Sequence, residues 1–164
     1  MGRVASLAII VLVAFGATAC SAEFPPQEPL ANVCSLLKGD EVATIAPGND
    51  GGKAAGEETM PDFWVRSCDY TTPDFHYASL AVDGASDGDG GNILKEFFNA
   101  VGVDGTKESV DGVGDEAIFW DDGVETGVTA KAKGYLVTFT ALLDPPPPKS
   151  ALIPLTKKAI ARLP

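Results

Sequence analysis

The sequence predicts an α+β fold, in which an antiparallel sheet of about five strands carries helices on one face and a single disulfide is present. Short turns separate segments of alternating apolar residues, which favours antiparallel pairing of neighbouring strands. Segments with helical spacing precede, interrupt and follow these strands. The expected order is therefore helices, hairpin, helix, three strands and helix.

The first nineteen residues differ from the rest of the chain. They hold no acidic residue and one basic residue, Arg3, followed by an apolar run at 7–15. This run has about the length of a signal-peptide core and is shorter than the ~20 residues that a membrane-spanning helix needs. We predict a lipoprotein signal peptide at 1–19, a proline-rich tether at 20–32 and one globular domain at 33–164.

The domain is expected to begin with two short helical turns. Leucine, valine and isoleucine give the segment 34–46 an apolar face, Gly39 interrupts it and Pro47 ends it. Residues 47–61 are rich in Gly, Glu and Asp and hold few apolar side chains. This composition predicts a mobile loop.

Five segments have the pattern of strands. The first two, 63–71 and 76–83, are separated by a turn sequence and predict a hairpin. The other three are 116–121, 126–133 and 135–143, and the middle one alternates most regularly between small apolar and polar residues.

Two later segments have helical spacing. In 92–101 the apolar residues recur every four positions, with Asn92 as a candidate N-cap and Gly102 as the residue after the C-cap. The segment 150–163 carries an apolar stripe, and Pro154 is expected near its first turn.

An odd number of cysteines in an exported chain requires an explanation, and two are open. If residues 17–19 form an ordinary signal-peptidase site, Cys20 becomes a free N-terminal thiol. If the same residues and Cys20 form a lipobox, Cys20 carries a diacylglyceryl thioether, with palmitate as the expected acyl chain, and Cys34 pairs with Cys68. The second reading is favoured because it leaves no exposed reactive thiol.

The composition argues against nucleic-acid binding. The net charge is −11, and removal of Arg3 with the signal peptide makes it −12. Such a chain has no basic stripe to displace counterions from a phosphate backbone. We expect no nucleic-acid partner.

No sequence motif indicates catalysis or a cofactor, and we predict that the protein is not an enzyme. His76 is the only histidine, and no nucleophile motif lies near it. The acidic stretch 83–92 fails the EF-hand pattern in both registers, although calcium binding through Asp83, Asp87 and Asp89 stays open. We expect no cofactor and no other metal site.

Several motifs together resemble a family of small actinobacterial cell-envelope lipoproteins grouped as a domain of unknown function. They span most of residues 20–164 and are, in order, Cys20, VCSLL at 33–37, EVATI at 41–45, RSCDY at 66–70, VDGVGDEA at 110–117, Trp120 and KGYLV at 133–137. The proline run at 145–148 departs from the family's pattern. The resemblance implies a Cys34–Cys68 disulfide and an envelope location, and it implies no activity.

The sequence therefore predicts a non-catalytic lipoprotein on the extracytoplasmic face of the cell membrane, whose domain binds a small ligand or an envelope protein. The alternatives are a structural accessory subunit of an envelope complex, and a secreted protein without lipid or a weak hydrolase. Four aromatic side chains are candidates to line a ligand groove, with core packing as the competing role: Phe63, Trp64, Phe119 and Trp120.

Overall fold

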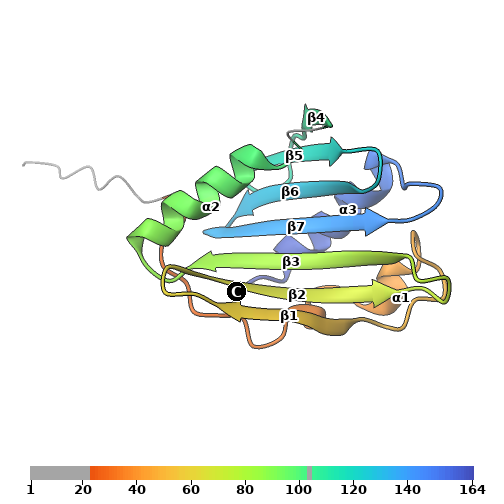
Figure 1. Cartoon of the computed structure of the whole chain (residues 1–164), viewed down its shortest axis with the longest axis horizontal. Coiled ribbons are helices and arrows are strands. Elements are labelled where there is room, and N and C mark those ends of the chain that lie inside the picture. Colours follow the sequence, from red (N-terminus) through yellow and green to blue (C-terminus); the bar gives the residue numbers. More distant parts are fainter. Residues whose placement is uncertain (1–22, 103–104) are drawn as a thin grey trace, which may run out of the picture.

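The computed structural model describes residues 23–102 and 105–164 (Figure 1). The predicted signal peptide and Cys20 lie outside these residues. The elements in chain order are η1 (Val33–Ser35), α1 (Gly39–Val42), β1 (Lys53–Thr59), β2 (Phe63–Thr71), β3 (Tyr77–Ala85), α2 (Gly88–Ala100), β4 (Thr106–Ser109), β5 (Glu116–Asp121), β6 (Thr126–Ala132), β7 (Tyr135–Leu142) and α3 (Lys149–Ala161).

The strands form one antiparallel sheet of seven, in the order β1-β2-β3-β7-β6-β5-β4. The α+β class, the β2–β3 hairpin and the three strands β5 to β7 confirm the prediction. The strand number was wrong, because β1 and β4 complete the two edges. β1 lies within the predicted mobile loop 47–61; nearly all its side chains are exposed, so it has none of the apolar alternation by which strands are found.

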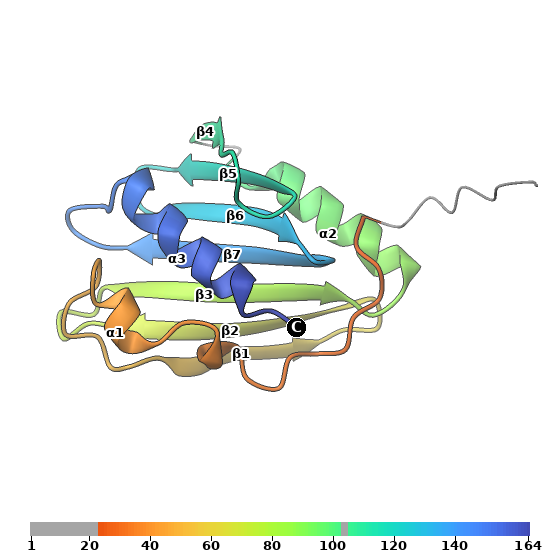
Figure 2. The same ribbon diagram turned by 180° about the vertical axis from the view of Figure 1, so that it is seen from behind.

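The helices pack on both faces of the sheet, and the expectation of one helical face was wrong (Figures 1 and 2). The larger core joins α1, α3 and η1 to one face, through side chains such as Trp64, Phe139 and Leu152. The smaller core joins α2 to one end of the other face, through Leu94 and Phe98. Consecutive residues of a strand point to opposite faces of the sheet. A strand with apolar residues at both odd and even positions, such as β5, therefore contributes side chains to both cores.

The segment predicted to be a tether packs along the domain from residue 23 onward. Phe24 is buried in the smaller core, and the backbone N–H of Gln27 donates to the Ala85 carbonyl at 2.8 Å. The Trp64 indole in turn donates to the Gln27 carbonyl at 2.9 Å. Prolines keep this segment extended, but its carbonyls and Phe24 still make contacts with the sheet.

The start of α2 and the position of Pro154 in α3 differ from the prediction. α2 begins at Gly88, where the Asp87 carboxylate accepts hydrogen bonds from the amides of Asp89 and Gly90, so Asn92 is not its N-cap. Its C-terminal end agrees, because Gly102 follows the cap residue with φ of +67°. α3 begins at Lys149, which places Pro154 beyond its first turn.

Each tryptophan lies over a glycine of the next strand. Trp64 covers Gly84 on the larger-core face, and Trp120 covers Gly127 on the other face. A Cβ at Gly84 would lie 2.3 Å from Cζ2 of Trp64. A buried indole cannot move aside without disturbing its neighbours, so these positions require glycine.

Gly84→Ala is therefore expected to lower the free energy of unfolding by about 1–3 kcal/mol, the usual cost of overpacking a core. Urea denaturation followed by tryptophan fluorescence measures it. Gly88→Ala is the matched control, because no atom lies within 4 Å of a Cβ at that position. Equal midpoints for native protein and Gly84→Ala would show that Trp64 does not require the glycine.

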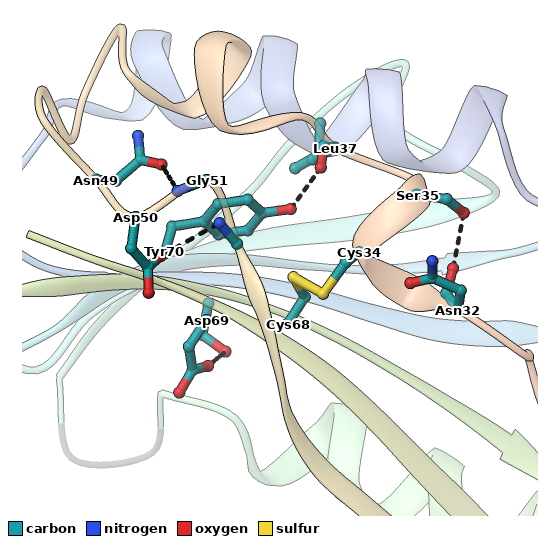
Figure 3. Close-up of a disulfide and its surroundings, with 12 residues drawn as sticks. Asn32, Cys34, Ser35, Leu37, Asn49, Asp50, Gly51, Cys68, Asp69 and Tyr70 are labelled. Carbon is teal, nitrogen blue, oxygen red and sulfur yellow. Dashed lines mark hydrogen bonds between the residues drawn. A yellow bond between two sulfur atoms is a disulfide. The ribbon is translucent and has the colours of Figure 1, made fainter.

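The predicted disulfide joins η1 to β2 (Figure 3). Cys34 and Cys68 have Cα atoms 5.1 Å apart and are 34 positions apart in the sequence. Next to it, the buried Tyr70 hydroxyl donates to the Leu37 carbonyl at 2.7 Å. Burial raises the pKa of Tyr70 to about 12, so this donor keeps its proton at physiological pH.

Candidate functional site

The four aromatic side chains proposed for a groove lie in the two cores instead. Trp64 is fully buried, and Phe63, Phe119 and Trp120 are at most 9% exposed. Trp64 and Phe119 belong to the larger core, whereas Phe63 and Trp120 belong to the smaller one. They therefore share no surface, and their role here is packing.

Two adjoining hollows, each of about 400 Å³, lie instead at the end of the sheet where the β2–β3 turn, the β5–β6 turn and the end of β7 meet. We name them the α1 hollow and the β5–β6 hollow. Both are lined by His76, Leu143, Asp144 and Pro146. Pockets of this size are in the range that binds small molecules.

The proline connector, residues 145–148, lines the α1 hollow with all four of its prolines and the β5–β6 hollow with Pro146. It leads from β7 into α3, and its first peptide bond, Asp144–Pro145, is cis. A run of four prolines has few accessible backbone conformations and no free amide. The connector is therefore a stiff wall, which favours a site that is already formed before a ligand arrives.

The α1 hollow is lined by the turn that follows α1, the β2–β3 turn and the connector. Beyond the shared residues it is lined by Thr44, Ile45, Pro47, Thr72, Asp74, Pro145, Pro147, Pro148 and Ala151. Asp74 Oδ2 lies 3.1 Å from Nδ1 of His76, and the Thr72 hydroxyl donates to the other oxygen of Asp74. The Thr72 hydroxyl is the main cause that holds the pKa of Asp74 below its usual value, so this carboxylate stays charged.

The β5–β6 hollow is lined by the turn after β5, the end of β7 and the connector. Its own residues are Asp121, Gly123, Val124, Thr126 and Leu142. Asp121 Oδ1 accepts from the Gly123 amide at 2.8 Å, which fixes the turn. Thr126 is 2% exposed, and its hydroxyl has no partner among the described residues.

A histidine oriented by a carboxylate provides two of the three members of a hydrolytic triad, and the third is a nucleophile within reach of the imidazole. The threonines Thr44, Thr72 and Thr126 are the only hydroxyl side chains that line the hollows. Thr72 donates to Asp74 and reaches the His76 carbonyl at 2.9 Å, not the imidazole. The described part of the chain therefore holds no nucleophile set on His76.

The three aspartates considered for calcium do not come together as a site. Asp87 caps α2, and Asp83 lies on β3 between Val65 and Leu136. Within residues 23–102 and 105–164, no group of three or more His, Cys, Asp or Glu side chains has the arrangement of a metal site. Asp83 has a different property: Oδ1 is buried without a partner, and burial raises its pKa to about 7.

No protein-family model, curated protein sequence or solved structure matches this chain. Sequence reasoning missed the hollows because their residues come from three distant turns. The signals were present as Thr72-Pro73-Asp74 and the four prolines, but neither pattern specifies which turns meet.

Proposed function

We propose that this protein is a non-catalytic lipoprotein, anchored by lipid on Cys20 to the extracytoplasmic face of the cell membrane, whose domain binds a ligand in the two hollows around Pro146. The observation that carries the proposal is the pair of hollows with a rigid proline wall. Their walls combine aliphatic and proline side chains with carboxylates, threonines and His76, and polar groups of this kind orient a ligand in a binding site.

The position of the hollows fits an anchored protein. Glu23, the first described residue, forms ion pairs with Lys131 at one end of β6 and with Lys95 of α2. The β5–β6 hollow includes Thr126, at the other end of β6. A strand rises ~3.4 Å per residue, so about 17 Å separates the two ends. The β2–β3 and β5–β6 turns lie at the end of the sheet opposite the start of the described chain (Figures 1 and 2). A lipid attached shortly before Glu23 would therefore leave the hollows, which these turns line, on the far side of the domain.

A second candidate, the structural accessory subunit, is favoured by one side chain. Phe75 lies in the β2–β3 turn beside the hollows and is 86% exposed, with φ of +65°. A bulky residue rarely adopts this conformation, and an exposed aromatic side chain is a usual anchor of a protein interface. In this reading the same end of the domain contacts an envelope protein.

Cys20→Ala is expected to move the protein from the membrane fraction to the soluble fraction of a bacterial host, because it removes the two acyl chains that would anchor it stably. Among the described residues, no helix is long and apolar enough to cross a bilayer. The denatured mass of the native protein should equal residues 20–164 plus a diacylglyceryl group. Ala22→Ser is the control. A bare polypeptide mass for the native protein would refute the anchor.

Native mass spectrometry of the same preparation tests the ligand. A small molecule that is bound by the native protein, and lost when Val124→Trp fills the β5–β6 hollow, supports a ligand site there. If the Val124→Trp variant still binds the ligand, and the ligand shifts no amide NMR signal of the residues that line either hollow, the ligand binds elsewhere and the proposed site is refuted.

A further inference from the structure

The β5–β6 hollow has an unbalanced charge. Asp121 and Asp144 line it, Asp74 lines the adjoining hollow, and neither lining set contains a lysine or an arginine. Among the ion pairs of the described residues, only that of Asp74 with His76 involves residues that line a hollow. Asp121 is half-buried and Asp144 is exposed, so solvent screens their charges in part, but no lysine or arginine of the lining neutralises them.

The two carboxylates also keep hydrogen-bonding capacity. The described structure gives Asp144 no side-chain hydrogen bond, and Asp121 uses Oδ1 alone, for the Gly123 amide. A carboxylate has about four acceptor positions. Most of this capacity is therefore available to a bound donor.

The remaining lining is aliphatic. Val124 is 70% exposed at the mouth, and Leu142, Leu143 and Pro146 form the wall. Below them Thr126 is buried, and its hydroxyl has no partner in the described part of the chain. No aromatic side chain lines this hollow, although aromatic rings are the usual contacts of quaternary ammonium groups.

We propose that the β5–β6 hollow binds a primary alkylammonium group, with Asp121 and Asp144 pairing with the charge and the aliphatic wall covering the hydrocarbon chain. An ammonium has three donors and no acceptor, which matches two carboxylates with free acceptor positions. The proposal rests on the proposed function and specifies its ligand. The ammonium belongs either to a free amine or to a lysine side chain of a partner.

The test uses three unbranched probes of four carbon atoms each with different head groups: n-butylamine, butan-1-ol and butyrate. Each is titrated into the mature, lipidated protein in detergent micelles, and amide NMR shifts are followed at Val124, Thr126 and Leu143. Butylamine is expected to shift these amides at concentrations where butanol and butyrate do not. Salt should weaken its binding, because an exposed ion pair is screened.

Asp144→Asn and Asp121→Asn are each expected to weaken butylamine binding by about fivefold, the upper range for a partly exposed ion pair. Both substitutions keep the side-chain shape, and asparagine still accepts from the Gly123 amide. Asp111→Asn is the matched control, because Asp111 is exposed and lines neither hollow. Its affinity should equal that of the native protein.

The outcomes separate the ligand class from the site. Shifts at the hollow that are equal for the three probes, or unaffected by Asp121→Asn and Asp144→Asn, would refute the ammonium class and keep the site. No shift at the hollow with any probe would refute both. N-acetyl-lysine amide binding as tightly as butylamine would indicate a partner's lysine, and a preference for butylamine would indicate a free amine.

Discussion

Asp83→Asn is expected to raise the free energy of unfolding at neutral pH by about 2–4 kcal/mol, a stabilisation caused by removing one buried charge. Asp83 lies on the sheet face that α2 covers, between Val65 and Leu136 on the neighbouring strands. Its Oδ1 has no contact with solvent and no partner among the described residues. A carboxylate in such surroundings has lost hydration that no hydrogen bond replaces.

The pH dependence has a definite sign. Burial raises the pKa of Asp83 from 3.8 to about 7, so the folded protein binds this proton more tightly than the unfolded chain does. The stability that this proton provides is complete below pH ~4, falls as the pH rises through 7, and is absent above it. The advantage of Asp83→Asn over the native protein should therefore vanish at pH ~4 and reach its full value above pH 7.

Chemical denaturation of native protein and Asp83→Asn across this pH range measures the difference. Asp111→Asn removes the same charge from an exposed position, and its effect should stay within about 0.5 kcal/mol. A pH-independent difference between native protein and Asp83→Asn, or lower stability of the variant above pH 7, would show that Asp83 is charged and hydrogen-bonded in the folded state.

Helices and strands with one buried face were predictable because their apolar residues recur in the sequence with the period of the helix or strand. The β2–β3 hairpin, β5 to β7, and the course of α2 and α3 all follow from such periods. β1 was not predictable in this way. Its position depends on hydrogen bonds to β2, from Lys53 opposite Asp69 to Thr59 opposite Trp64, and these leave no trace in an exposed edge strand.

The faces on which the helices lie, and the site, depend on contacts that are distant in the sequence. Alternate side chains of β5 point to opposite faces of the sheet, and both sets are buried. This agrees with helices on both faces, but the sequence of a strand does not specify which helix covers which face. The hollows require three turns and the proline connector to meet. The disulfide was predictable from cysteine chemistry: if the chain is exported and Cys20 carries lipid, as the sequence predicts, only Cys34 and Cys68 are left to pair.

Loss of the Cys34–Cys68 bond is expected to lower the free energy of unfolding by about 3–4 kcal/mol, from the entropy that the bond removes from the unfolded chain. The double variant Cys34→Ala/Cys68→Ala tests this without leaving a free thiol. Cys68 is fully buried, so the cavity left by its sulfur adds to the loss. The contacts that remain there include the Tyr70 bond to Leu37 and the pairing of Arg162 with Glu41 at 2.6 and 2.8 Å.

Reductant separates the bond from the side-chain change. Under non-reducing conditions the native protein should unfold at higher denaturant than the double variant. Reductant should lower the native midpoint toward that of the variant and leave the variant unchanged. Since the bond ties η1 to β2, while α2 packs on the other face of the sheet, the loss should weaken hydrogen-exchange protection first around η1 and α1. Equal midpoints without reductant, or two free thiols in the denatured, unreduced protein, would show that the bond does not form in solution.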